Sequence, residues 1–249
     1  MAKLDAGFTA APIAHRGLHG PGVPENSMAA FLAAIDAGYG IELDVQPASD
    51  GTPMVFHDET LARLCGAEGL IAALGPDQLA GLRLYETDQT IPTLRSVLDE
   101  VAGRVPLLIE IKDQDGALGR DFGKLVENVA RMVDTYDGPA ALMSFNPHMV
   151  AACAKAAPGV ARGLTSCHFA EADWPRVDEA TRQSLAALEM FDEVGASFVS
   201  HFWGDLGNPA IAALKSRGVP VLCWTIRTPE QEAQARAVAD GITFELYRP

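Results

Sequence analysis

Residues 40–46 read GIELDVQ, an apolar run in which two acidic side chains stand two positions apart. A run of this length is typical of a buried β-strand, and side chains two positions apart in a strand point to the same face of the sheet. The aliphatic residues would therefore face one way, and Glu42 and Asp44 the other. The stretch predicts a strand that packs under helices on one face and carries charge near the end of the other.

Seven other short apolar runs resemble this one, and helical stretches separate them. The eight predicted strands are residues 12–15, 40–46, 106–112, 140–145, 161–165, 197–201, 220–225 and 241–245. The predicted amphipathic helices include 26–37, 122–133, 149–156, 210–217 and 229–238. Because strands that alternate with helices indicate a parallel sheet, eight such units in 249 residues predict an α/β fold, a closed (β/α)8 TIM barrel. A doubly wound open sheet is the alternative, but no Gly-x-Gly-x-x-Gly motif follows the first strand.

Two departures from a regular barrel are predicted. The segment 47–93 is too long for one helix and two loops, and it contains a small extended stretch at 54–58, so we expect an insertion after the second strand. The sequence stops four residues after the eighth strand, so the last helix is expected to be missing or vestigial. Because no linker or low-complexity tract interrupts the pattern, residues 1–249 are expected to form a single domain.

The composition argues against several classes of protein. The chain has 19 Lys and Arg against 33 Asp and Glu, a net charge of −14. A nucleic-acid surface neutralises phosphates with basic side chains, so we expect no nucleic-acid partner. No apolar run reaches the length of a membrane-spanning helix, and the first residues lack the apolar core of a signal peptide. With four cysteines and no Cys-x-x-Cys pair, we expect reduced thiols and a cytoplasmic protein, while the oligomeric state is not indicated.

The predicted third strand repeats the pattern of the second, with Glu110 and Lys112 two positions apart. In a (β/α)8 barrel the active site lies at the carboxyl ends of the strands. Glu42, Asp44 and Glu110 would converge there and repel one another unless something neutralises them. We favour a hard divalent cation, Mg²⁺, Ca²⁺ or Mn²⁺, held by the three carboxylates. The alternative is a buried ion network in which Lys112 and Arg16 pair with the acids.

Two histidines and two basic side chains accompany these acids. His15 ends the first predicted strand, and His57 lies in the inserted segment, from which it could lean over the same mouth. Because histidine titrates near neutral pH, both are candidates for general acid and general base. Arg16 and Lys112 are candidates for binding an anion, since a guanidinium or an ammonium group matches phosphate oxygens.

Two further residues are expected at the mouth. Trp224, near the end of the seventh predicted strand, offers a flat apolar face for a small carbon skeleton, although it could equally belong to the barrel core. His201 ends the sixth predicted strand and is a candidate pocket residue. At the start of the first predicted helix, Asn26 or Ser27 is expected to serve as the N-cap, which is a structural role.

In their order along the chain, these motifs resemble the glycerophosphodiester phosphodiesterase family. The resemblance rests on HRG at 15–17, PENS at 24–27, GIELDV at 40–45, DGTPMVFHD at 50–58, IPTL at 91–94, IEIK at 109–112 and CWT at 223–225. It spans nearly the whole chain, and the motifs are specific as an ordered set. One departure is at the end, where residues 241–249 read GITFELYRP and the family often has Gly-Ile-x-Thr-Asp-x-Pro.

The resemblance implies a (β/α)8 barrel with an insertion after strand two. It implies metal-dependent hydrolysis of a small-molecule glycerophosphodiester to sn-glycerol 3-phosphate and an alcohol. By this resemblance, the three carboxylates bind one divalent cation, and His15 and His57 act as general acid and general base. Arg16 and Lys112 bind the phosphate. The route it implies is attack by the glycerol 2-hydroxyl, which gives a cyclic phosphate that water then opens. Two histidines that exchange roles suit these two steps.

Other functions compete with this one. A carboxylate-pair glycosidase would explain two acids but neither the histidines nor the bases. An amidohydrolase-like metal barrel would need His-x-His on the first strand, where this chain has HRG. A related phosphodiesterase of lysophospholipase D type stays open, as does a protein that binds a phosphorylated metabolite without turnover. The sequence indicates neither the alcohol of the substrate, nor the divalent ion, nor which histidine acts first.

Overall fold

The structure is a computed structural model that describes residues 2–249, and Met1 lies outside the described residues. The strands are β1 (Ile13–Ala14), β2 (Gly40–Pro47), β3 (Pro53–Val55), β4 (Leu107–Ile111), β5 (Ala140–Ser144), β6 (Ala161–Ser166), β7 (Phe198–Phe202), β8 (Val221–Ile226) and β9 (Gly241–Phe244). The helices are α1 (Gly7–Ala10), α2 (Met28–Asp36), α3 (Ala62–Cys65), α4 (Pro76–Ala80), α5 (Leu94–Val101), α6 (Leu125–Asp134), α7 (Pro147–Ala156), α8 (Glu179–Ala186), α9 (Pro209–Ser216) and α10 (Pro229–Ala235), with short 3-10 turns η1 (Ile71–Ala73) and η2 (Trp203–Asp205).

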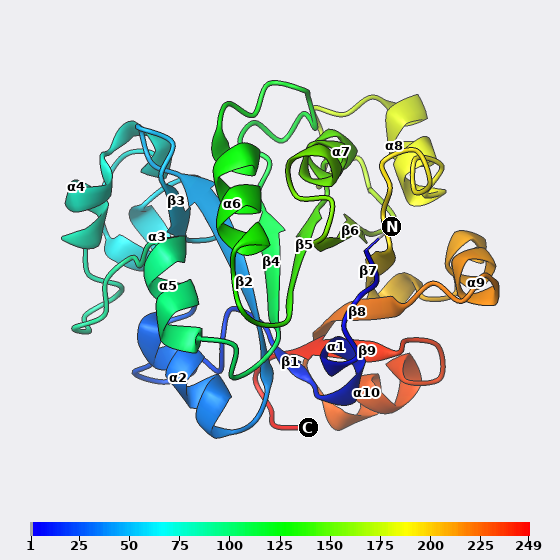
Figure 1. The fold of residues 1–249 in the computed structure, drawn as a ribbon, viewed down its shortest axis with the longest axis horizontal. Coiled ribbons are helices and arrows are strands. Elements are labelled where there is room, and N and C mark those ends of the chain that lie inside the picture. Colours follow the sequence, from blue (N-terminus) through cyan, green and yellow to red (C-terminus); the bar gives the residue numbers. More distant parts are fainter. Residues whose placement is uncertain (1) are drawn as a thin grey trace.

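Within the described chain, eight parallel strands close into a barrel with helices around it (Figure 1). Neighbours around the barrel follow the order β1, β2, β4, β5, β6, β7, β8 and β9, and β1 pairs with both β2 and β9. All eight strands and the five named helices expected from the sequence are present, with bounds shifted by a few residues. The (β/α)8 TIM barrel is therefore confirmed, and the open doubly wound sheet is not what forms.

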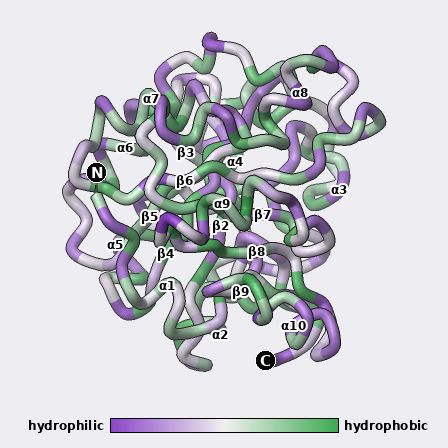
Figure 2. Tube along the Cα trace, turned by 90° about the vertical axis from the view of Figure 1, so that its right-hand side faces the viewer, coloured by the Kyte–Doolittle hydropathy of each residue, from purple (hydrophilic) through white to green (hydrophobic). Residues whose placement is uncertain are grey.

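Side-chain alternation along the strands separates two apolar layers. Outward residues such as Leu43 and Ile109 pack under helices, against side chains such as Phe31 of α2 and Val129 of α6. Hydrophobic residues accordingly run along the central strands, while hydrophilic residues are frequent in the outer loops (Figure 2). The inward face carries the polar side chains described below, as the alternation of residues 40–46 predicts.

The amino-terminal end of the barrel interior is filled by a separate apolar cluster. Phe8 of α1 is fully buried there with Leu108, Phe198 and Leu222. Gly163 of β6 leaves space for the Phe198 ring, because a Cβ at that glycine would lie 2.4 to 2.6 Å from three ring carbons. The interior is therefore closed at this end, so the opposite end is where a ligand can enter.

The segment between β2 and α5 forms the expected insertion. β3 pairs antiparallel with the end of β2, outside the barrel. The short helices that follow have an apolar cluster of their own, which includes Phe56, Leu61 and Leu79. Residues 245–249 after β9 contain no helix in the described structure, as expected. That residues 1–249 form one domain stays a prediction.

Five of the described helices, α1, α3, α4, α5 and α8, were not among those named from the sequence. α8 buries only Leu185 in the core, so it lacks the recurrent apolar positions by which an amphipathic helix is identified. No helix among residues 2–249 is both long enough and apolar enough to cross a membrane.

The contact between β6 and β7 gives a test of the barrel packing. We expect Gly163→Ala to lower the free energy of unfolding by about 1–3 kcal/mol, because the added methyl group must displace a ring in a closely packed interior. Urea unfolding followed by circular dichroism measures this change. Gly207→Ala is the matched control, since no heavy atom lies within 4 Å of a Cβ built there. Equal stability of the two variants would contradict the packing described.

Candidate active site

Three carboxylates meet at the carboxyl ends of β2 and β4. Glu42 and Asp44 lie two apart on β2, and Glu110 on β4 is the register partner of Asp44. One oxygen of each carboxylate lies within 4.8 Å of the other two, and all three residues are buried. The parallel register thus brings together the three acids that the sequence analysis placed at the mouth.

The three carboxyl groups differ in how their charge is compensated. Burial, together with the charges of Asp44 and Glu110, raises the pKa of Glu42 well above its usual range. Burial acts in the same direction on Asp44, but nearby positive charges, that of Lys112 foremost, outweigh it and hold the pKa of Asp44 below its usual range. Lys112 Nζ lies 2.7 Å from Glu110 Oε1 and 3.5 Å from Asp44 Oδ1. Negative charge at Glu42 is therefore the charge that the site compensates least.

Glu42 has a backbone partner in place of a cationic side chain. It accepts the backbone N–H of Arg16 at 2.9 Å. Among residues 2–249, no Lys or Arg side chain forms an ion pair with Glu42, and the nearest imidazole nitrogen, Nε2 of His15, is 4.0 Å away. The buried ion network does form, because Lys112 and Arg16 pair with the other two acids. It leaves Glu42 without a lysine or arginine partner.

Arg16 points into the mouth because the chain turns sharply after β1. Its φ is 56°, and Gly17 follows with a φ of 79°. A Cβ at Gly17 would lie 2.8 Å from the Cβ of Ala30, so the turn requires glycine. Arg16 Nη1 donates to Glu25 at 2.6 Å, while Nε is buried without a hydrogen bond, 3.4 Å from Asp44 Oδ2. The guanidinium group therefore keeps one unused buried donor beside the acids.

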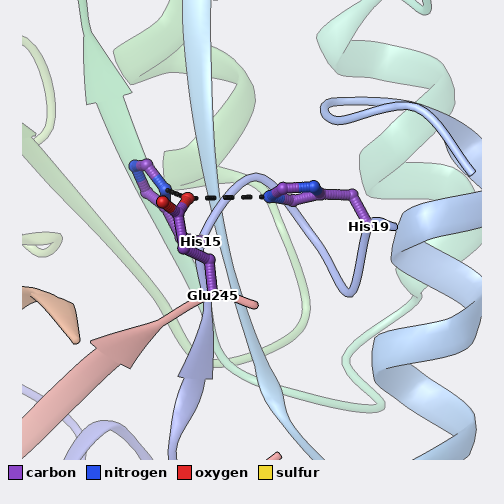
Figure 3. Close-up of side chains that lie close together, drawn as sticks. All are labelled: His15, His19 and Glu245. Carbon is purple, nitrogen blue, oxygen red and sulfur yellow. Dashed lines mark hydrogen bonds and ion pairs between the residues drawn. The ribbon is translucent and has the colours of Figure 1, made fainter. Parts of the chain in front are cut away.

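His15 is held by the carboxylate that directly follows the last strand. Its Nδ1 donates to Glu245 Oε2 at 2.6 Å, and Nε2 of His19 lies 3.7 Å from the same oxygen (Figure 3). Arg227 Nε donates to the other oxygen of Glu245 at 2.7 Å. Burial lowers the pKa of His15, so near pH 7 the ring is neutral with its proton on Nδ1. Its Nε2 is then a free acceptor.

His57, in the inserted segment, is oriented in the same way. Its Nδ1 donates to Asp58 Oδ1 at 2.8 Å. Burial would raise the pKa of Asp58, but hydrogen bonds from Arg63 and His57 lower it to about 2. Arg63 also donates to Glu25 at 2.8 Å, and Glu25 in turn binds Arg16. One ion-pair network therefore ties the insertion to the turn after β1.

The segment PENS at 24–27 has two different roles. Ser27 is the N-cap of α2, since its Oγ accepts the N–H of Ala30 at 3.2 Å, as expected for one of the two candidates. Asn26 instead clamps Asp44: its Nδ2 donates to Asp44 Oδ2 at 2.9 Å, and its Oδ1 accepts the Asp44 N–H at 3.3 Å. Asn26 is therefore a site residue that a purely structural interpretation misses.

The two residues expected to line a pocket have different surroundings. Trp224 is half-buried and lines an open hollow of about 330 Å³ at the ends of β5 to β8. His201 lies outside this hollow, because its side chain is fully buried. Its Nδ1 is 2.7 Å from Ser166 Oγ, and its Nε2 is 3.1 Å from Asp205 Oδ2. Both ring nitrogens thus contact groups of the protein itself. The ring connects the end of β6 to the η2 turn that follows β7.

Glu245 was missed as a site residue, although barrel closure could have located it. The last strand of a closed barrel pairs with the first, and β9 pairs with β1 at Ala14↔Phe244. A carboxylate that directly follows the last strand therefore falls beside the histidine that directly follows the first. In the sequence, Glu245 stands out only as part of a departure from a family motif.

The acidic group fits a divalent cation on the chemistry of its donors. It offers oxygen ligands only, close enough together to share one ion, and this donor set favours Mg²⁺, Ca²⁺ or Mn²⁺. No Lys or Arg side chain of the described residues pairs with Glu42, so one of the three negative charges lacks a cationic partner, and the raised pKa of Glu42 agrees with this. A bound dication would supply the missing positive charge.

Comparison with known proteins gives a family. The family model of the glycerophosphoryl diester phosphodiesterase family matches residues 15–245. A glycerophosphodiester phosphodiesterase from Caldanaerobacter subterraneus subsp. tengcongensis is 30% identical over 241 residues, which cover 92% of this chain and 91% of that protein. The residues matched by the family model, 15–245, span the positions of both histidines and all three acids.

Solved structures share the fold. A phosphodiesterase from Oleispira antarctica, in complex with the product sn-glycerol-3-phosphate, has a TM-score of 0.78 at 22% identity, covering 96% of this chain and 94% of that one. A glycerophosphodiester phosphodiesterase from Thermotoga maritima has a TM-score of 0.73 at 24% identity, covering 94% and 93%. The barrel described above is therefore an architecture that solved phosphodiesterases have.

The contact between His15 and Glu245 can be tested without any substrate. We expect Glu245→Gln to lower the pKa of His15 further, because the change removes a negative charge that favours the imidazolium ion. Nuclear magnetic resonance titration of the His15 ring in the metal-free protein measures this. Glu230→Gln, at an exposed position in the first turn of α10, is the control. A rise, or no change beyond that of the control, would contradict the assigned contact.

Proposed function

We propose that this chain, which belongs to the glycerophosphoryl diester phosphodiesterase family, hydrolyses glycerophosphodiesters to sn-glycerol 3-phosphate and an alcohol. One observation carries the proposal. Three buried carboxylates share the barrel mouth with two basic side chains and two imidazoles, each of which has its Nδ1 on a carboxylate. This arrangement suits a phosphodiester, whose cleavage needs charge compensation on the phosphoryl oxygens and a proton transfer at each side of the phosphorus.

We assign the metal site to Glu42, Asp44 and Glu110. Asn26 fixes the orientation of Asp44, and the Arg16 backbone N–H fixes that of Glu42, so two of the three ligands are held by hydrogen bonds. A divalent cation bound there would act as a Lewis acid that stabilises charge on a phosphoryl oxygen and lowers the pKa of a nearby hydroxyl group.

The two imidazoles are assigned the proton transfers. The carboxylate on each Nδ1 fixes the tautomer and leaves Nε2 as the working atom. His15, which is neutral because burial lowers its pKa, is suited to accept the proton of an attacking hydroxyl group. His57, from the insertion, is suited to give a proton to the leaving alcohol. The roles reverse when water opens a cyclic phosphate, and the carboxylates of Glu245 and Asp58 stabilise whichever ring is protonated.

Arg16 and Lys112 are assigned to the phosphate. Burial would lower the pKa of Lys112, but Glu110 and Asp44 outweigh it and hold the pKa above its usual range, so the ammonium group stays charged. The free Nε donor of Arg16 is buried beside the same acids. Once the negative charge of the carboxylates is shared with a cation, both groups can direct N–H bonds at phosphoryl oxygens.

The charge of Glu42 gives a pH-dependent test of metal binding. Its folded-state pKa is raised, so its contribution to the stability of the metal-free protein falls as pH rises from about 4.5 through the raised value. Metal competes with that proton, so we expect Mg²⁺ or Mn²⁺ to raise the melting temperature more at pH 8 than at pH 5.

Thermal unfolding with added metal, compared with chelator, measures this effect at each pH. Phosphodiesterase activity should be lost in chelator and regained with Mg²⁺, Mn²⁺ or Ca²⁺. Asp44→Asn should remove both the thermal shift and the regained activity. Full activity in chelator, or a larger thermal shift at pH 5, would refute the assignment.

The histidine assignments are tested by His15→Ala and His57→Ala. Each variant should lower kcat by about 10² to 10⁴-fold, the usual contribution of a positioned acid or base. The Mn²⁺ affinity of both should stay close to that of the unchanged protein, because neither imidazole is assigned to the metal. Release of glycerol 3-phosphate from glycerophosphoethanolamine measures kcat, and His148→Ala, on α7, is the control. A variant that keeps normal turnover would remove that histidine from the mechanism.

A further inference from the structure

The mouth of the barrel is divided into a charged side and an aromatic side. The proposed catalytic, metal and phosphate residues stand at the ends of β9, β1, β2 and β4 or in the insertion that follows β2, and these four strands are consecutive around the barrel. The other four strands, β5 to β8, border the hollow that Trp224 lines. Four aromatic residues, which we call the aromatic hollow, dominate its wall: Phe145, Trp174, Phe202 and Trp224. The proposed function uses only the charged side.

The four rings form a continuous wall. Phe145 lies with its centroid 5.1 Å from that of Trp174 and 5.6 Å from that of Trp224. The centroids of Phe202 and Trp224 are 5.7 Å apart. All four side chains are only half-buried, although rings of this size bury well when packing is their sole role. Their exposed faces are therefore available to a ligand.

The aromatic hollow adjoins the proposed phosphate site. Glu110 pairs with Met143 across β4 and β5, and Ser144 Oγ donates to the carbonyl of Ile111 at 2.7 Å. Continuing this register by two residues places Phe145 beside Lys112. Neighbouring strands lie about 4.8 Å apart, so a phosphoester held by Lys112 has one substituent within reach of the rings.

The chemistry of the wall favours a cation. The faces of aromatic rings carry negative electrostatic potential, and they attract alkylammonium groups within about 6 Å. Asp173 adds a carboxylate to the rim, and the described residues that line the hollow include no Lys or Arg. The net charge of −14 adds a long-range attraction in the same sense. An anionic group would meet repulsion here, and a neutral polyol would find few hydrogen-bond partners on a wall of rings.

Resting on the proposed function, we propose that the aromatic hollow binds a quaternary ammonium group on the alcohol of the substrate. The chain would then prefer a choline-type glycerophosphodiester to one with a neutral alcohol. In such a diester the trimethylammonium group is two carbons from the phosphoester oxygen. The anion and the cation of one small molecule would therefore occupy the two sides of the mouth at once.

A binding experiment tests the hollow without reference to catalysis. The chain has three tryptophans, and Trp203→Leu leaves the two of the hollow as fluorescent reporters. We expect choline to change their fluorescence saturably, and the neutral isostere 3,3-dimethylbutan-1-ol to bind about tenfold more weakly, as expected when a desolvated cation–π contact is lost. Equal binding of the two, or no binding of choline, would overturn the proposal.

A specificity experiment tests the link to substrate. Trp174→Leu should lower the ratio of kcat/KM for glycerophosphocholine to kcat/KM for glycerophosphoglycerol by about tenfold, whereas Trp203→Leu should keep the ratio. An equal decrease of kcat/KM for both substrates would mean that the hollow contacts the glycerol that they share or only supports the fold. Either result would overturn the proposal. Asp173→Asn, at an exposed position, should weaken choline binding severalfold. This variant replaces Trp174→Leu as the test if the latter fails to fold.

The two experiments separate this proposal from the proposed function. If the unchanged protein hydrolyses neither diester in the presence of metal, the proposed function fails. The choline titration still tests whether the hollow binds a quaternary ammonium group. If it hydrolyses both with equal efficiency and choline does not bind, the hollow proposal fails while the proposed function stands.

Discussion

Three carboxylates buried within 4.8 Å of one another are tolerated only where positive charge lies among them. The barrel imposes this proximity, because Asp44 and Glu110 are register partners on adjacent strands and Glu42 shares their face. Lys112 compensates two of these acids directly. The third, Glu42, is left with a backbone N–H and a strongly raised pKa. Strand geometry therefore leaves Glu42 as the group whose charge a bound divalent cation would compensate, which supports the proposed metal site.

The same constraint organises the layer of side chains around the acids. Carboxylates of this layer each orient a group that faces the mouth: Glu245 orients His15, and Asp58 orients His57. These outer acids are compensated from outside, Glu245 by Arg227 and Asp58 by Arg63. Each of these outer acids thus binds one imidazole on the side of the mouth and one arginine on its other side. This explains how a strongly acidic chain can present basic groups to an anion.

The sequence predicted what depends on local pattern. Alternation within residues 40–46 and 106–112 was enough to place acids and Lys112 inside the barrel, and strand spacing was enough for the fold. Side chains whose roles depend on distant partners were not predicted: the contact between Glu245 and His15 joins residues 230 positions apart. His201 shows the converse, because its position at a strand end suggested the mouth, while its ring is taken up by Ser166 and Asp205. A strand end fixes the location of a residue but leaves its partners open.

The division of the mouth also explains where sequence resemblance is informative. The motifs that resemble the family are dense up to Lys112 and sparse afterwards, and the strands before that residue supply most of the charged side. The aromatic side comes from β5 to β8, and of its four rings only Trp224 belongs to a motif of the resemblance, CWT at 223–225. The other three stand singly: Phe145 after β5, Trp174 in the loop after β6, and Phe202 at the end of β7. They become a site only because neighbouring strands in a closed barrel bring their ends to one rim. The reaction can therefore be inferred from motifs, whereas the choice of alcohol has to be inferred from the assembled wall.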